Sequence, residues 1–249
     1  MKMFLAAASL AAAASLCAQA ASAQTRVDPL DLSVTLTPTL ATDYLFRGIS
    51  QTRNRPAAQL TFEALHDSGF YVGAFLSNVA FAGTNARQEV DALAGYRFQM
   101  LDINWDVGAI YYSYPGSRRL APGAYNIDYI EGAVKASRAV GPATLSAAVN
   151  LSPNYFGQSG TGVYLEGGVD LALPLGFTAS GRLGYQWIEH EPRFGTPDYL
   201  WYSVGAAHDI PGGVTLAVGY YGTDIHQRDC GGGQKICDER VLFTVSRKF

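Results

Sequence analysis

Apolar and polar side chains alternate along most of this chain, and the pattern is clearest in residues 239–249. Val241, Phe243, Val245 and Phe249 fall on one face at a period of two, while polar side chains fall on the other. A period of two is typical of a β-strand with one apolar face. In a soluble sandwich such a terminal strand would be an exposed edge, whereas in an outer-membrane barrel it pairs with the first strand and closes the ring.

The same alternation recurs along the chain and predicts an all-β fold, a closed antiparallel transmembrane β-barrel of about twelve strands. In the first predicted strand, Leu36 and Leu40 lie on the face expected to meet lipid, and Thr35 and Thr37 lie on the opposite face. An even number of strands is the rule for single-chain bacterial barrels. The predicted strands cover residues 32–47, 57–65, 69–79, 87–98, 102–114, 125–138, 143–152, 162–173, 177–188, 198–208, 214–224 and 239–249.

The connections between these strands alternate in length. Short, mostly Gly- or Pro-containing turns are predicted at residues 66–68, 99–101, 139–142, 174–176 and 209–213. Longer links are predicted at residues 48–56, 80–86, 115–124, 153–161, 189–197 and 225–238. This alternation predicts short periplasmic turns, long extracellular loops and both termini in the periplasm. Aromatic residues near the long links, Tyr44, Phe46, Tyr112 and Tyr114 among them, are predicted to form one of two interfacial belts.

The composition agrees with a membrane barrel and excludes some other classes. Hydrophobic residues make up 48% of the chain and charged residues 16%, with 27 Gly and 15 Tyr. After the N-terminal segment, no apolar run reaches the roughly 20 residues that a membrane helix needs. The formal net charge is −3, and loss of Lys2 with a cleaved leader makes it −4. A mildly acidic chain is an unsuitable partner for nucleic acid.

The N-terminus has the pattern of a secretory signal peptide, residues 1–23. Lys2 provides the positive charge, residues 4–16 are rich in Ala and Leu, and Ala21-Ser22-Ala23 is a cleavage site of the A-x-A type. Leu16 precedes Cys17 where a lipoprotein signal requires a small residue, so Cys17 is expected to leave with the leader. The remaining residues, 24–249, are predicted to form one barrel domain in the bacterial outer membrane.

Several short blocks carry a family resemblance. Residues 41–51 read Ala-Thr-Asp-Tyr-Leu-Phe-Arg-Gly-Ile-Ser-Gln, and shorter blocks follow at 69–73, 77–79, 95–97, 153–157, 184–186 and 246–249. Together these blocks resemble the TorF-like porin family over nearly all of the chain after the leader. The resemblance implies an outer-membrane barrel and identifies no substrate.

Polar residues on the inward faces of the strands are the candidate functional residues. They support two interpretations of similar weight: a charged constriction that filters solutes, or an internal ion-pair network that plugs a narrow barrel. The sixth strand is ambiguous, because Glu131 and Lys135 share one face while Asp128 lies on the other. The pore-lining candidates are Arg47, Glu63, Glu89, Asp91, Arg97, Asp106, Glu131, Lys135, Glu166, Asp170, Arg182, Gln186 and Lys248.

Motifs for catalysis, cofactors and metals are scarce. The four histidines lie in or beside predicted turns and loops, and neither a metal-binding helix motif nor a Gly-x-Ser-x-Gly elbow occurs. No catalytic residue, cofactor or metal is therefore predicted. Cys230 and Cys237 flank a glycine-rich spacer in the last long link, and secretion favours a disulfide between them. A metal site is the weaker alternative, since His226 would be the only imidazole nearby.

These features predict a porin-like channel for passive diffusion of small hydrophilic solutes or ions. The alternatives are a non-conducting structural or adhesive barrel and, with less support, an outer-membrane enzyme. The expected partners are outer-membrane lipid, small hydrophilic solutes, and the barrel-assembly machinery acting through the C-terminal strand. Acids outnumber bases among the inward residues, so an open lumen is expected to be weakly cation-selective.

Overall fold

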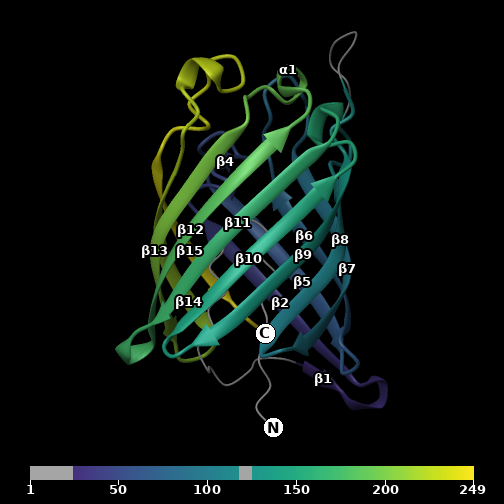
Figure 1. The fold of residues 1–249 in the computed structure, drawn as a ribbon, viewed down its shortest axis with the longest axis vertical. Helices are drawn as coiled ribbons and strands as arrows, with labels where there is room; N and C mark the ends of the chain where they lie inside the picture. The colour runs from purple at the N-terminus through teal and green to yellow at the C-terminus, as the bar shows by residue number, and fades with distance from the viewer. Residues whose placement is uncertain (1–24, 118–124) are drawn as a thin grey trace.

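The computed structural model describes residues 25–117 and 125–249, and twelve long antiparallel strands form a closed barrel in it (Figure 1). Strand β2 pairs with β5 on one side and with β15 on the other, so the last strand closes the ring onto the first. The predicted fold class is confirmed. The barrel strands are β2 Leu32–Ala41, β5 Ala57–His66, β6 Phe70–Asn78, β7 Gln88–Met100, β8 Ile103–Ser113, β9 Tyr129–Val140, β10 Ala143–Ser152, β11 Gly162–Ala172, β12 Phe177–Ile188, β13 Tyr199–Ile210, β14 Val214–Thr223 and β15 Arg240–Arg247.

The closing seam between β2 and β15 is completed at the C-terminal residue. The backbone N–H of Phe249 donates to Leu36 O at 2.9 Å, and the N–H of Leu36 donates to Phe249 O at 3.1 Å. Regular pairing resumes from Ser246 opposite Thr39. Pro38 lies between these two sets of bonds and has no N–H to donate, which interrupts the seam locally.

The connections alternate in length around the ring, as the sequence predicts. Short turns join β5 to β6, β7 to β8, β9 to β10, β11 to β12 and β13 to β14, while the other connections are longer. The longer connections and the short helix α1 (Glu191–Phe194) lie at the upper end of Figure 1, and the C-terminus lies toward the lower end. Leu101 and Asp102, in the tight turn after β7, both have positive φ, as a two-residue hairpin turn requires.

Small elements at the short-turn end hold the start of the described chain against the barrel. Strand β1 (Thr25–Val27) pairs with β2, and the 3₁₀ helix η1 (Asp28–Leu30) follows it. Arg26 binds Asp67 in the first short turn, with an Nη1–Oδ1 distance of 2.5 Å. This hydrogen-bonded guanidinium lowers the pKa of Asp67. No helix in the described ranges is long and apolar enough to cross a membrane.

The outer face of the barrel is apolar. Large hydrophobic side chains on every barrel strand point outward, and Leu40 and Val204 expose 65% and 61% of their surface. In β10, Val149 and Leu151 are exposed while Asn150 between them is buried. A continuous exposed apolar wall of this kind is typical of barrels that sit in lipid.

The first predicted strand ends earlier than expected. Strand β2 stops at Ala41, and the chain then turns into the barrel to form a small hairpin, β3 (Leu45–Phe46) and β4 (Ile49–Ser50). We call residues 42–56 the inserted hairpin. The prediction of one strand over residues 32–47 is therefore wrong, because the two-residue alternation continues through the hairpin although the chain has left the wall.

Sterics at the hairpin tip show how closely it packs on the wall. Arg47 and Gly48 both have positive φ, 49° and 82°, which defines a tight two-residue turn. A Cβ atom added at Gly48 would lie 2.7 Å from Thr223 Cγ2 and 2.9 Å from Trp201 Cβ. Glycine is required here for both reasons, and the tip lies directly against strands β13 and β14.

Aromatic side chains fill the barrel interior around the hairpin. Tyr112 and Tyr129 stack with ring centres 4.3 Å apart, and Tyr44 packs edge-on against Phe75 at 5.7 Å. The predicted membrane belt is thus wrong for Tyr44, Phe46, Tyr112 and Tyr114, which lie inside. Burial within the barrel competes with the lipid interface for these rings, and their position next to a long loop does not distinguish the two. Three loop residues also join the interior cluster: Phe81, Phe156 and Phe194.

Candidate functional site

The barrel interior is the candidate functional site, and Arg47 at the hairpin tip is its most connected residue. Its guanidinium forms a two-pronged ion pair with Glu131 of β9, with distances of 2.9 Å (Nη1–Oε1) and 2.6 Å (Nη2–Oε2). Nη1 also donates to Oε1 of Gln186 in β12 at 2.7 Å. The guanidinium carbon lies 3.9 Å from the centre of the Tyr164 ring in β11. One side chain therefore ties the hairpin to three strands of the wall.

Glu131 receives further donors from the wall. Asn150 Nδ2 donates to Oε2 at 2.9 Å, and the Tyr112 hydroxyl donates to the same oxygen at 3.3 Å. Both partners of the ion pair are buried, Arg47 with 6% and Glu131 with 2% of its side chain exposed. Buried charges are tolerated only when they are paired and hydrogen-bonded, and here both conditions are met. The network defines where the hairpin sits.

Asp43 organises the base of the hairpin. Its Oδ1 accepts hydrogen bonds from the hydroxyls of Ser50 and Thr52, both at 2.6 Å, and from the backbone N–H of Tyr44 at 2.8 Å. Its Oδ2 pairs with Nη1 of Arg240, the first residue of β15, at 2.8 Å. The hairpin is thus attached at its base as well as at its tip.

The last long loop, residues 224–239, covers the hairpin. Cys230 and Cys237 are joined by a disulfide in this loop, with Cα atoms 6.1 Å apart. The backbone N–H of Ser50 donates to Ile236 O at 2.9 Å, and Arg240 Nη2 donates to Lys235 O at 2.7 Å. The disulfide therefore stiffens the segment that holds the hairpin inside the barrel.

Glu89 and Asp91 form a second buried site on the inward face of β7. Glu89 has 2% and Asp91 0% of its surface exposed. Oε2 of Glu89 and both carboxylate oxygens of Asp91 have no hydrogen-bond partner among the described residues. This pair differs from Glu131, whose charge is matched by an arginine.

The interior nearer the short turns holds ion pairs between neighbouring strands. Arg97 binds Glu63 through Nη1 and Nη2, at 2.8 and 2.6 Å, and Asp106 through Nε at 3.1 Å. The Tyr71 hydroxyl donates to Asp106 at 2.7 Å, and the Tyr71 ring lies beneath Arg97 at 4.2 Å. A Cβ added at Gly95 would lie 2.6 Å from the Tyr71 hydroxyl, so the glycine makes room for this ring.

Other charged residues line the same part of the wall. Arg182 of β12 pairs with Asp170 of β11 through Nη2, at 2.7 Å to each carboxylate oxygen. Glu166 accepts a hydrogen bond from the Tyr164 hydroxyl. Lys135 of β9 is half-buried opposite Asp106 in the strand register. Lys248, beyond the end of β15, is half-buried and in phase with the inward residues Thr244 and Ser246.

The structure places all of the pore-lining candidates on the inner side of the wall or, for Arg47, on the inserted hairpin. It brings together Arg47, Glu131 and Gln186 at the hairpin tip and Glu63, Arg97 and Asp106 nearer the short turns. Glu89 and Asp91 form a separate pair. Several hydrogen-bond and ion-pair partners inside the barrel were not predicted from the sequence, among them Asp43, Tyr71, Asn150, Tyr155 and Arg240. Asn150 and Arg240 fall on inward positions of their strands, which was the only available signal.

The position of Asp128 is explained without a bulge in the sixth predicted strand. Strand β9 begins at Tyr129, so Asp128 lies in the loop before it and accepts a hydrogen bond from the Tyr114 N–H at 3.0 Å. The described residues contain no group of three or more His, Cys, Asp or Glu side chains arranged to hold a metal ion.

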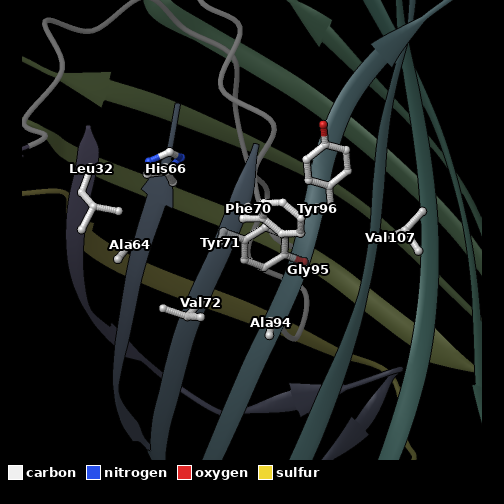
Figure 2. A pocket seen from close by; sticks show the side chains of 10 residues that line it. All are labelled: Leu32, Ala64, His66, Phe70, Tyr71, Val72, Ala94, Gly95, Tyr96 and Val107. Atoms are coloured by element: carbon white, nitrogen blue, oxygen red, sulfur yellow. The ribbon is translucent and has the colours of Figure 1, made fainter. Parts of the chain in front are cut away.

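A shallow hollow lies on the outer face of the barrel, across the ends of β2, β5, β6, β7 and β8 near the short turns (Figure 2). Its lining is mainly apolar, with Phe70, Val72 and Tyr96 prominent in Figure 2. His66 contributes a polar group. Because this hollow opens on the lipid-facing side, it is separate from the interior site.

The fold and its interior define a porin-like β-barrel. Residues 23–249 match the model of a family described as a bacterial protein of unknown function, Gcw_chp, and the chain belongs to this family. No curated protein matches the sequence.

Solved porins share the fold. A KdgM porin is 8% identical and gives a TM-score of 0.55, covering 86% of this chain and 98% of its own. A NanC porin is also 8% identical, with a TM-score of 0.56 and coverage of 87% and 98%. At this identity the similarity concerns the fold alone.

Proposed function

We propose that this protein is an outer-membrane channel of the porin type, through which small hydrophilic solutes or ions diffuse. The observation that carries the proposal is a closed ring with an apolar outer face and a charged inner face. Lipid outside and water inside are the surroundings that such a wall suits. The shared fold with KdgM and NanC porins and the resemblance to the TorF-like family support the same proposal.

The inserted hairpin is the proposed restriction of the path. Its contacts with Glu131 and Gln186 and the surrounding aromatic cluster occupy the interior toward the long loops. We propose that the residues nearer the short turns line the water-filled part, whereas those around the hairpin form the restriction. The first group is Glu63, Arg97, Asp106, Lys135, Glu166, Asp170, Arg182 and Lys248, and the second is Arg47, Glu89, Asp91, Glu131 and Gln186.

The second candidate is a non-conducting structural or adhesive barrel that acts through its loops. The observation that favours it is the same hairpin, because a rigid and fully satisfied network could close the interior permanently. An enzymatic function has less support. Ser68 Oγ does contact His66 Nδ1 at 2.7 Å, but this pair belongs to an exposed turn.

We propose that the barrel lies in the bacterial outer membrane. Residues 1–23, which include the predicted signal peptide, lie outside the described residues. In this proposal the short turns face the periplasm and outer-membrane lipid surrounds the wall. The C-terminal strand engages the barrel-assembly machinery. The position of Phe249 in the closing seam supports a role for this strand in closure.

Single-channel recording distinguishes the two candidates. Purified mature protein is inserted into a planar lipid bilayer and the current is measured at several salt concentrations. Discrete conductance steps that grow with salt are expected of the channel. Silence of correctly folded protein, checked by its β-sheet circular dichroism, would instead favour the non-conducting barrel.

A further inference from the structure

The buried acids Glu89 and Asp91 take part in none of the ion pairs among the described residues. They are two residues apart on one strand face, so their Cα atoms are about 7 Å apart along β7. Three of their four carboxylate oxygens have no hydrogen-bond partner among the described residues. An isolated carboxylate in such a place is costly, and buried carboxylates are found paired or coordinated to a metal.

The arginines of the interior are already engaged elsewhere. Arg47 is held by Glu131, Arg97 by Glu63 and Asp106, Arg182 by Asp170 and Arg240 by Asp43. None of these four arginines therefore forms an ion pair with Glu89 or Asp91 in the described part of the chain. With both carboxyls deprotonated, the pair has a formal charge of −2, which one divalent cation would neutralise.

Neutral oxygen atoms lie near Glu89. Ser77 of β6 lies directly opposite Glu89 in the strand register, and cross-strand neighbours have Cβ atoms about 5 Å apart. The hydroxyls of Tyr44, on the hairpin, and Tyr114, after β8, lie beside Glu89, as does the carboxyl of Asp91. Asp91 lies between Phe75 and Tyr112 on the flanking strands. Carboxylate and neutral oxygens from several elements are the ligand type that hard cations prefer.

We propose that Glu89 and Asp91 bind a calcium ion inside the barrel, with hydroxyl oxygens or water completing its coordination. Calcium accepts six to eight oxygens in irregular geometry, whereas magnesium requires a near-ideal octahedron. Two carboxylates from one strand and oxygens from separate elements fit the more tolerant ion. The site does not depend on whether the barrel conducts.

Terbium luminescence is a direct test, because terbium replaces calcium and is sensitised by nearby tyrosine. The purified full-length mature protein, refolded in detergent without lipopolysaccharide, is titrated with terbium chloride and then with calcium chloride. Saturable emission that calcium displaces is expected. Equilibrium dialysis with radioactive calcium should give one tightly bound ion per barrel.

Substitutions locate the site. Asp91→Asn and Glu89→Gln keep the side-chain shape and should weaken calcium binding about tenfold or more, since affinity follows the number of charged ligands. Asp102→Asn is the matched control: it removes one carboxylate in an exposed turn, at a φ of 58° that asparagine tolerates, and should leave binding unchanged. Equal loss in D91N and D102N would overturn the site, as would the absence of a bound ion in wild-type protein by dialysis. So would a melting temperature that responds to pH but not to calcium, because the two carboxyls would then share a proton.

Discussion

Replacement of Arg47 by alanine tests whether the inserted hairpin restricts the lumen. The substitution removes both bonds to Glu131, the bond to Gln186 and the contact with the Tyr164 ring. Glu131 would then keep only the neutral donors Asn150 and Tyr112. Breaking a buried ion pair by removal of one partner costs about 3–5 kcal/mol. The hairpin's docking equilibrium should therefore shift by roughly 10²- to 10⁴-fold toward the undocked state.

The assay is single-channel recording of wild-type and Arg47→Ala protein at the same voltage and salt concentration. The variant should show a higher open probability or a larger conductance step. Arg53→Ala is the matched control, because Arg53 is exposed in the same segment. Its φ of 56° is close to the 49° of Arg47, so alanine has the same left-handed backbone cost at both positions. The difference between the two variants therefore reports the side-chain contacts alone.

Identical conductance and open probability in Arg47→Ala and Arg53→Ala would refute the reasoning. If the single variant does not fold, the double variant Arg47→Ala/Glu131→Gln removes the stranded carboxylate and allows the same measurement. A folded double variant that remains silent alongside a conducting wild type would show that the path does not run past the hairpin.

Three other predictions follow from the loops and the charge pattern. Reduction of the disulfide, or Cys230→Ser with Cys237→Ser, should destabilise the loop by roughly 2–3 kcal/mol and lower the melting temperature; full labelling of thiols in unreduced, denatured wild-type protein would contradict the bridge. A tag inserted near Gly116 should be detected on intact cells and one near Ser68 should not, and the reverse result would invert the topology. In calcium-free buffer an open channel should be weakly cation-selective in a salt gradient, because Glu89 and Asp91 then give the inward residues their excess of acids; Glu166→Gln should reduce the reversal potential, whereas anion selectivity would refute the charge map.

The wall of the barrel could be predicted closely because one physical constraint acts on every strand. Apolar groups must face outward and polar groups inward, which imposes a period of two on the sequence. The predicted strand 143–152 agrees with β10, and strand 177–188 agrees with β12, residue for residue. The same constraint assigns each charged strand residue to one face of the wall, although Arg47 lies on the inserted hairpin and on no barrel strand.

The interior contacts could not be predicted because they join distant parts of the chain. Arg47 and Glu131 are 84 residues apart, and Arg240 and Asp43 are 197 apart. Alternation states which face a residue occupies but gives no information about which residue it meets across the lumen. The inserted hairpin adds a second difficulty, since Tyr44 and Phe46 alternate as strand residues do although they belong to no barrel strand.

The two interior sites are physically connected through Tyr44. This residue belongs to the inserted hairpin, and its hydroxyl lies beside Glu89 of the proposed calcium site. A calcium ion with this hydroxyl as a ligand binds the site more tightly when the hairpin is docked than when it is undocked. Calcium must therefore favour docking. At 100 times its dissociation constant, such an ion stabilises the docked state by up to about 2.7 kcal/mol. This is close to the lower estimate for the loss of the Arg47 contacts, so calcium should partly close an Arg47→Ala channel, and Asp91→Asn should abolish that closure.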